Sequence, residues 1–561
     1  MNTDDIKITL KKLTADIDAI VDPQVTVILR ILLNLVDVLI AADDSNKETI
    51  QKLKDEINRL KGEQGKPDFN KKKKGKDPEN TNHSSEADRN KRNKKKSRKK
   101  RIEKTKEIEV DRCEIVTIDM SALPADAVFK GYETTVIQDL VIVTNNVAFK
   151  RPIYYSPSLK KSFVAKLPDG YQGEFGPGIR SLVINLYRDA GMTEPAIARF
   201  FKTWGVSISG STISRMITEG HDHFHQEKEA IINAGLKATD YQHIDDTGSK
   251  VAGKSHYTHI ICNPYFTAFF TRPRKDRLTL LEILCRGELK FSLNQTTYEL
   301  MTALGLSEKC LNELKALIPT DVVLTRNGLD EILKKLFPNL TKQKSNRRII
   351  LEACAIVYYR STEYAIKHLV CDDAPQFNLI AMHKSLCWVH EGRHFKKLNP
   401  FVPAHRAILD DFLEKFWDYY QLLLEYKEAH TPEKALQLSQ AFDALFLTKT
   451  GYDELDKRIA KTLAKKGALL LVLDFPFLPL HNNPAELGAR VQARMRDVNL
   501  QTISENGMKS KDTFATIFQT AKKLGVNTYR YVYDRITKKF EMTSLADLIT
   551  AKLIHPELIT T

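Results

Sequence analysis

A short apolar run that stops at two carboxylates constrains the fold of this chain most. The apolar residues 369–371 lead straight into Asp372 and Asp373, and Pro375 prevents the strand from continuing. This pattern predicts a buried strand whose last residue lies at the carboxyl edge of a sheet, where open α/β folds build their sites. A carboxylate there is costly to desolvate unless a positive partner meets it. The alternative is an ordinary acidic turn, and the choice depends on whether other acids have the same setting.

Composition indicates a soluble cytoplasmic protein with several domains. The chain has 561 residues, of which 42% are hydrophobic and 28% are charged. Its seven cysteines include no C-x-x-C pair, which favours buried thiols in a reducing compartment. The acidic, polar N-terminus predicts no signal peptide. The most apolar window, residues 25–42, contains Arg30, Asn34 and Asp37, so we expect no membrane span.

The net charge of +15 is concentrated in one segment. Residues 71–106 contain 17 Lys and Arg against 5 Asp and Glu, which is +12, so the rest of the chain contributes only +3. Such a run is usually disordered when free, and it releases counterions when it binds phosphates. We therefore predict a basic, disordered linker over residues 63–108 that binds DNA. A solvated arm without a specific partner is the alternative.

Residues 1–62 are predicted to be helical. Apolar residues recur at alternating spacings of three and four, and Asp43 and Asn46 occupy two of the seam positions between them. The apolar residues of this pattern are Leu29, Leu32, Val36, Leu39, Ile50, Leu53, Ile57 and Leu60. This spacing predicts a coiled coil that pairs protomers, with the polar break setting its register. An amphipathic helix packed on its own chain is the alternative.

The next two regions differ in type. Residues 109–160 are predicted to be a small β-rich segment with strands over 113–119 and 133–143, because β-branched residues dominate there. Residues 161–235 are predicted to be a helical region.

That region contains a helix-turn-helix pattern. Thr193 would cap a helix over 194–202, Gly205 would make the turn, and a second helix would cover 209–217. The second helix offers side chains that reach phosphates or base edges, namely Ser211, Thr212, Ser214 and Arg215. A plain helical hairpin is the alternative.

Residues 236–535 read as one α/β domain, followed by a tail over 536–561. In chain order we predict strands at Asp245 and over 255–262 and 265–271, a helix over 276–284, a helical insertion over 286–347, a strand over 365–371, a helical segment over 403–467, and a helix that starts at Asn482 and carries Glu486. Three strands, a helix, a fourth strand and a closing helix is the ribonuclease-H-like order. In that fold the first and fourth strands are neighbours, so Asp245 and Asp372 would meet, with Glu486 over them.

The predicted fold class is therefore multidomain α/β. It is a ribonuclease-H-like mixed sheet flanked by helices with a helical insertion, preceded by a helix-turn-helix, a small β-rich segment and an N-terminal coiled coil. Clustered carboxylates repel one another, and divalent cations remove that conflict. Two Mg²⁺ or Mn²⁺ ions held by such acids are the apparatus of phosphoryl transfer. A zinc site at Cys387, His390 and His394 is a weaker indication, and a packed helix face is the alternative.

Four ordered segments resemble the DDE transposases of the insertion sequence 66 family. They are residues 243–247, 372–377, 387–390 with Arg393 and Phe395, and 482–486 with Arg490; residues 520–526 also resemble the end of that family's catalytic domain. The resemblance covers roughly residues 150–535. It implies that Asp245, Asp372 and Glu486 are the catalytic, metal-binding triad. Family members often carry a cysteine-based zinc module before this domain, whereas this chain has only Cys113 there.

Further site residues are expected around this triad. Asp246, Asp373, Asn483, His390 and Arg393 would support it. Arg490, Lys509 and Lys511 would contact DNA near the cut, with a solvated face as the alternative.

The resemblance implies a bacterial transposase that cuts the ends of its element and joins them to target DNA. Its partners would be double-stranded DNA and further copies of itself, as a homodimer or higher oligomer, and it would be nucleoid-associated when on DNA. The alternatives are a ribonuclease-H-like nuclease without strand transfer and a non-catalytic DNA-binding protein.

Overall fold

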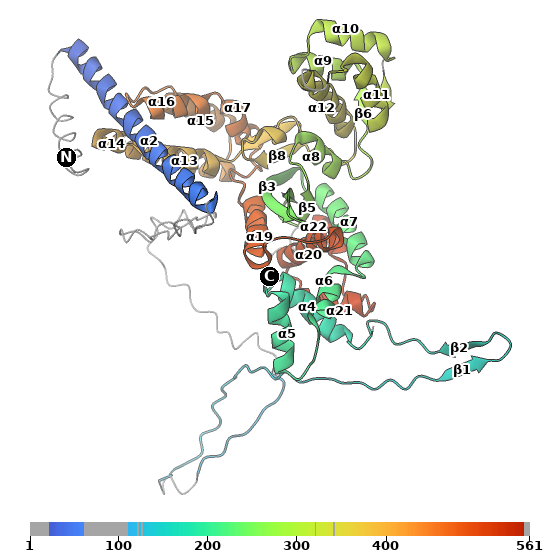
Figure 1. Cartoon of the computed structure of the whole chain (residues 1–561). Coiled ribbons are helices and arrows are strands. Elements are labelled where there is room, and N and C mark those ends of the chain that lie inside the picture. The colour runs from blue at the N-terminus through green and yellow to red at the C-terminus, as the bar shows by residue number, and fades with distance from the viewer. Residues whose placement is uncertain are drawn as a thin grey trace. The chain divides into compact units, whose positions relative to one another are not determined.

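The computed structural model describes most of the chain (Figure 1). The described residues are 22–60, 110–119, 123–124, 127–171, 173–319, 321–339 and 343–554. The basic linker predicted over 63–108 lies outside them. The chain divides into two units, one made of residues 1–74, 167–197 and 210–561, and one made of residues 75–166 and 198–209.

A five-stranded mixed sheet organises the larger unit. Its strands are β3 (Tyr241–Val251), β4 (Lys254–Cys262), β5 (Thr267–Arg272), β8 (His368–Cys371) and β9 (His383–Leu386), in the order β5-β4-β3-β8-β9. The first three strands form an antiparallel meander, whereas β8 and β9 run parallel to β3. The meander and the strand before Asp372 are confirmed. Strand β9 was not predicted, because it is four residues long and contains one aliphatic residue.

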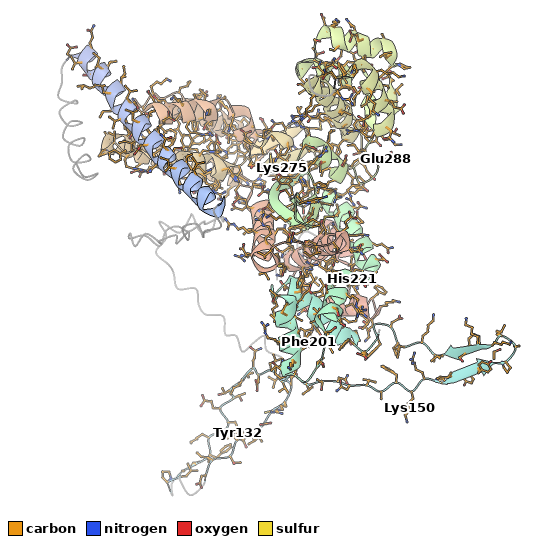
Figure 2. All side chains as sticks on the ribbon, viewed as in Figure 1. Tyr132, Lys150, Phe201, His221, Lys275 and Glu288 are labelled. Carbon is orange, nitrogen blue, oxygen red and sulfur yellow. The ribbon has the colours of Figure 1, made fainter. Side chains whose placement is uncertain are left out.

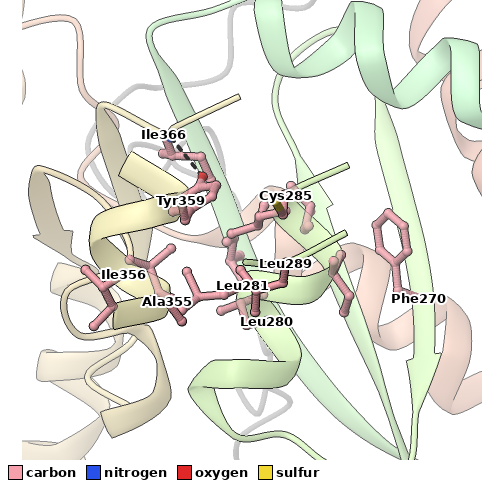
Figure 3. Close-up of a cluster of buried hydrophobic side chains, with 14 of the residues drawn as sticks. Phe270, Leu280, Leu281, Cys285, Leu289, Ala355, Ile356, Tyr359 and Ile366 are labelled. Carbon is pink, nitrogen blue, oxygen red and sulfur yellow. Dashed lines mark hydrogen bonds between the residues drawn. The ribbon is translucent and has the colours of Figure 1, made fainter. Parts of the chain in front are cut away.

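Helices cover both faces of this sheet. On one face, Ile244, Ile261 and Phe270 join a core with α7 (Asp222–Lys237) and α8 (Arg277–Leu284). Figure 3 shows Phe270 and the α8 leucines of this core, and the hydrogen bond of 2.9 Å from the Ile366 N–H to the Tyr359 hydroxyl. On the other face, Ile260 and Phe269 pack against Ala485 of α19 (Asn483–Asn499).

Helix α20 (Glu505–Leu524) covers the outer edge of strand β5. The backbone N–H groups of β5 donate to side chains spaced four residues apart on α20: Thr267 to Thr520 Oγ1 at 3.2 Å, Phe269 to Thr516 Oγ1 at 3.1 Å, and Thr271 to Asp512 Oδ2 at 2.6 Å. An exposed row of unpaired N–H groups would invite pairing with another chain. The helix therefore closes this edge.

A helical insertion separates α8 from β8. It contains α9 (Gln295–Ala303), α10 (Glu308–Leu317), α11 (Arg326–Leu336) and α12 (Lys344–Arg360), with a two-stranded sheet of β6 (Phe291–Leu293) and β7 (Val322–Leu324). As predicted for residues 286–347, none of it joins the five-stranded sheet. Helix α12 runs beyond the predicted end, and its Ile356 and Tyr359 enter the main core.

The helical segment predicted over 403–467 is also helical in the structure. It consists of α14 (Pro403–Glu428), α15 (Pro432–Phe446), α16 (Asp453–Leu463) and the start of α17 (Lys466–Leu469), and α18 (Leu471–Asp474) follows. This segment has its own aromatic core, into which α13 (Trp388–Lys396) inserts Trp388 and Phe395.

The N-terminal helix α2 (Pro23–Leu60) has two different faces. Leu33 packs on Val402, and the Asp37 carboxylate accepts from the backbone N–H groups of Phe401 at 2.6 Å and Val402 at 2.9 Å. Leu32 and Leu39 are 50% and 67% exposed. Packing on its own chain therefore accounts for one face only, and the coiled coil stays a prediction for the other.

Part of α2 also meets the length and hydropathy of a membrane span. Residues Gln24–Asp43 have a mean hydropathy of 2.3 and are the one such stretch among the described residues. Asn34 lies in this stretch and is buried against the chain itself, since its amide donates to Gly451 O at 3.1 Å and accepts from the Asp453 N–H at 3.0 Å. The helix face that holds Asn34 and Asp37 is thus covered by protein.

The predicted strands over 113–119 and 133–143 are wrong. The described residues of both stretches belong to no strand or helix, and Val116 and Ile137 are 91% and 82% exposed. β-branched residues favour a strand only where a neighbouring strand and a packed surface are present. The hairpin of β1 (Ile153–Ser156) and β2 (Lys161–Val164) is the only sheet among the described residues of this unit. Figure 2 shows the side chains of Tyr132 and Lys150 on extended backbone.

The predicted helix-turn-helix region contains α4 (Pro177–Arg188), α5 (Glu194–Thr203) and α6 (Gly210–Thr218). The last two form at the expected positions. Thr193 Oγ1 accepts from the Ala196 N–H at 3.4 Å, and Gly205 takes the positive φ of 74° that a tight turn needs.

The predicted C-terminal tail over 536–561 is wrong for its described part. Helices α21 (Thr528–Ile536) and α22 (Leu545–Ile554) follow α20, and Leu545 and Ile549 of α22 are fully buried in the main core. Helix α22 therefore contributes to the core that contains α7 and α20.

Candidate active site

Asp245 lies on strand β3, and Asp372 directly follows the neighbouring strand β8. His243 of β3 is paired with Val370 of β8, so the same register, continued by two residues, brings Asp245 beside Asp372. Burial, together with the charges of Asp372, Asp246 and Glu486, raises the pKa of Asp245 to about 7, against a hydrogen bond of 2.8 Å from the Asp246 N–H that lowers it. Asp245 therefore interacts electrostatically with both other members of the predicted triad, Asp372 and Glu486.

Glu486 reaches this point because α19 lies close against the sheet. A Cβ added at Gly488 would be 2.8 Å from Ile260 Cγ2, so only glycine permits this approach. Ile260 is the cross-strand partner of Asp245, which puts both side chains on the face that α19 covers. Asn482, just before the helix, donates to the Ile244 carbonyl at 2.9 Å and fixes the position of its first turn.

Helix α13 supplies two side chains to Glu486. Arg393 Nη2 donates to Glu486 Oε2 at 2.8 Å, and His390 Nδ1 lies 3.5 Å from Oε1. Arg393 Nη1 also lies 3.3 Å from His390 Nε2. A guanidinium can only donate, so Nε2 must accept and the ring proton lies on Nδ1, toward Glu486. Burial lowers the pKa of His390, which favours this neutral form.

Several buried polar atoms at this site have no hydrogen-bond partner in the described part of the chain. They are Glu486 Oε1, His390 Nδ1 and both amide atoms of Asn483. Leaving such a group unpaired costs about 1–3 kcal/mol. A cation and its water ligands would satisfy these oxygens, and the donors Asp245, Asp372, Glu486 and Asn483 offer the oxygen ligands that Mg²⁺ and Mn²⁺ prefer. These residue types suit a divalent metal, but among the described residues only Cys387, His390 and Glu486 place three ligand atoms within 4.8 Å of one another.

The two adjacent acids, Asp246 and Asp373, form hydrogen bonds and ion pairs with other side chains. Asp246 points to the opposite face of β3, where it accepts from Gln376 Nε2 at 2.6 Å and faces Lys275 Nζ at 3.5 Å. Asp373 pairs with Lys465 Nζ at 2.8 Å and Lys384 Nζ at 3.2 Å. Desolvation alone would raise the pKa of Asp373, but the bonds and charges of these two lysines outweigh it and hold the pKa low. Asp245 and Asp372 remain the better candidates for ligands.

The alternative zinc set is not assembled as predicted. One ligand atom each of Cys387, His390 and Glu486 lies within 4.8 Å of the others, and His394 is not among them. Burial raises the pKa of the Cys387 thiol to about 11, and its Sγ accepts from the Asn482 N–H at 3.2 Å. A thiol binds metal as the thiolate, which this environment disfavours. Cys387 instead helps to position Asn482, at the start of α19.

The predicted DNA-reading residues of α6 are exposed to different degrees. Ser211 and Arg215 are exposed and Thr212 and Ser214 are half-buried, whereas the apolar residues of the helix face the core. Arg215 Nη2 donates to Thr212 Oγ1 at 3.4 Å. This arrangement leaves one polar face of the helix at the surface.

The basic residues expected near the cut lie on α19 and α20. Arg490 is half-buried one turn after Glu486, and Lys509 is exposed. Burial lowers the pKa of Lys511 to about 8; Asp512 opposes this shift, whereas Arg188 and Arg496 add to it. Lys511 thus belongs to a cluster of cations from three helices.

Sequence reasoning missed the partners that hold the acids. Gln376, Lys384 and Lys465 contact Asp246 or Asp373 from other elements. Gln376 lies one residue after Pro375, so its closeness to the site could have been inferred. Nothing in the sequence points to Lys465, which comes from the far end of the helical segment.

Comparison with known proteins gives a relative without an assigned role. No family model matches the chain. An uncharacterized protein, y4jO, of Sinorhizobium fredii (strain NBRC 101917 / NGR234) is 29% identical over 331 residues, which is 100% of that protein and 57% of this chain. The chain is thus similar over the whole length of that protein.

Proposed function

We propose that this protein is a DDE transposase whose ribonuclease-H-like domain cuts the ends of a DNA element and joins them to target DNA. One observation carries the proposal: Asp245 lies on β3, Asp372 directly follows the adjacent parallel strand β8, and α19 brings Glu486 within electrostatic reach of Asp245. The strand order β5-β4-β3-β8-β9, with the first strand beside the fourth, supports the fold assignment. The partnerless oxygens of Glu486 and Asn483 support a metal at this point.

The chain's own residues have distinct roles in this proposal. Asp245, Asp372 and Glu486 Oε1 would hold two Mg²⁺ or Mn²⁺ ions, with Asn483 as a further oxygen donor. When bound, these ions supply the positive charge that activates a water or 3′-hydroxyl and stabilises the leaving oxygen. Arg393 would fix the orientation of Glu486 through Oε2, since Oε1 is buried and has no hydrogen bond in the described part of the chain.

Other parts of the chain would bind the DNA and a second protomer. The outer face of α6 would read the element ends, and Arg490, Lys509 and Lys511 would contact phosphates near the cut. The linker over 63–108 would hold the duplex through counterion release. The outward face of α2 would pair protomers in a homodimer or higher oligomer. We propose a bacterial cytoplasmic location, with the protein on the nucleoid when it is bound to DNA.

The test is a cleavage and joining assay on labelled DNA that contains the sequences flanking the reading frame. The wild type should cut and join in Mg²⁺, and Asp245→Ala, Asp372→Ala and Glu486→Ala should each abolish both steps. Asp240→Ala is a matched control, since this exposed acid lies just before β3 and pairs with Lys367 at 3.2 Å. Nicked products that are never joined would indicate a nuclease. Binding without cleavage in Mg²⁺ or Mn²⁺ would indicate a non-catalytic DNA-binding protein.

A further inference from the structure

A buried carboxylate on α13 is tied to the helical segment by several donors. Glu391 is 3% exposed and forms an ion pair with Arg458 of α16. Its Oε1 also accepts from Thr462 Oγ1 at 3.0 Å, and Lys465 Nζ lies 3.4 Å away. An unpaired buried carboxylate is strongly unfavourable, so these contacts hold α13 in one position against α16.

The remaining contacts of α13 strengthen this anchor. A Cβ added at Gly392 would lie 2.5 Å from Trp417 Cζ2 of α14, so the helix backbone sits directly on that ring. Phe395 packs on Phe412 with ring centroids 4.9 Å apart, and the Arg458 guanidinium lies 5.7 Å from the Phe395 centroid. This side of α13 is therefore seated on the helical segment.

The other side of the same helix supports the candidate active site. Arg393 follows Glu391 by two residues, which is about 200° around a helix, so the two side chains point in nearly opposite directions. Arg393 and His390 contact the two oxygens of Glu486. Helix α13 has only nine residues and moves as one short rod. The position of Glu391 against α16 therefore determines where Arg393 and His390 contact Glu486.

Lys465 makes a second connection to the site. Its Nζ lies 2.8 Å from Asp373 Oδ2 as well as 3.4 Å from Glu391 Oε1. Asp373 is the residue after Asp372, at the end of β8. One lysine of the helical segment thus joins the anchor of α13 to the turn that carries a proposed metal ligand.

We propose that Glu391, Arg458 and Lys465 form a positioning unit through which the helical segment 403–467 sets the geometry of the carboxylate site. The inference rests on the proposed function and deepens it. None of the three residues contacts the reacting atoms; they act through Arg393, His390 and Asp373. Partners in the outer shell of a metal site typically change metal affinity by about 10–100-fold when mutated. Displacing catalytic groups by about 1 Å can lower the rate about 100-fold.

The test compares Lys465→Met with Lys466→Met in the full-length protein. Lys466 is the adjacent lysine and pairs with Asp443 Oδ2 at 2.7 Å, within the helical segment, so it is a matched control. Mn²⁺ affinity is measured by titration calorimetry, beside thermal unfolding and cleavage. We expect Lys465→Met to weaken Mn²⁺ binding about 10-fold or more and to lower kcat more than it changes KM, whereas Lys466→Met keeps wild-type affinity.

Conservative variants separate positioning from folding. Lys465→Arg keeps a cation in reach of both carboxylates and should restore most of the Mn²⁺ affinity. If Lys465→Met does not fold, Thr462→Val, which removes one bond to Glu391, should still weaken Mn²⁺ binding several-fold. Wild-type Mn²⁺ affinity in a folded Lys465→Met or Thr462→Val protein overturns the inference. A separate outcome tests the metal site itself. If the wild type binds no Mn²⁺, or if Asp245→Asn binds it equally well, the proposed metal site fails, and the positioning unit fails with it.

Discussion

Replacing Asp37 by alanine should detach helix α2 from the body of its unit. The carboxylate accepts two backbone N–H groups and His405 Nδ1, and the Asp37 and His405 side chains are only 6% and 4% exposed. Hydrogen bonds to a buried charged group are worth about 1.5–3 kcal/mol each, and they are not additive. Breaking the whole set should cost about 3–5 kcal/mol. Because α2 has little other buried surface, it should separate rather than remain docked over unpaired groups.

Hydrogen exchange at the Phe401 and Val402 amides measures this directly. A loss of about 3 kcal/mol corresponds to roughly a 100-fold larger open population. Exchange at these amides should therefore accelerate by about 100-fold in Asp37→Ala and by less in Asp37→Asn, which keeps one acceptor oxygen. Leu32→Ala is the control, since Leu32 lies on the exposed face of α2. It should leave exchange unchanged and weaken only self-association. Unchanged exchange in Asp37→Ala would refute the docked position of α2.

Three further outcomes are expected. Asp512→Ala removes the acceptor for the Thr271 N–H and hydroxyl. It should lower the free energy of unfolding by about 2–3 kcal/mol in denaturant titrations and promote aggregation through the uncovered edge of β5. Equal stability and solubility would contradict the role of α20. The pKa of Asp245 is raised to about 7 in the folded state. Without metal, the folded state therefore holds a proton that the unfolded chain releases near pH 4. The free energy of unfolding should fall as pH rises from about 4 to 7. Asp245→Asn should flatten that slope, and saturating Mg²⁺ should reverse its sign; a slope unchanged in Asp245→Asn would assign it to other groups. Deleting residues 71–106 should reduce the salt dependence of DNA binding by about 0.9 in log–log slope for each phosphate that this segment neutralises, and an unchanged slope would give the segment another role.

The elements that hold the acids were predictable because local sequence determines them. Alternation in β3 places Asp245 and Asp246 on opposite faces, and Pro375 ends β8 at the acid pair. The Asn-Pro start of α19 puts Glu486 in its first turn. Each of these signals lies within a few residues of the side chain that it positions.

The features that sequence reasoning missed depend on contacts between distant segments. Nothing near Asp373 reveals Lys465, and nothing near Glu391 reveals Arg458. The strands predicted over 113–119 and 133–143 failed for the same reason, because strand propensity has no effect without a partner. The sequence predicts a tail where helix α22 forms, because the apolar residues of α22 fill a core that exists only once α7 and α20 are packed.

Anomalous scattering from Mn²⁺ in crystals of the full-length protein tests the central claim most directly. We expect manganese bound by the carboxylates of Asp245, Asp372 and Glu486, with Arg393 still on Glu486 Oε2, and no such peak in Asp245→Asn. Manganese that binds only at other acids, or a wild-type site without manganese at millimolar concentration, would contradict the proposed carboxylate site.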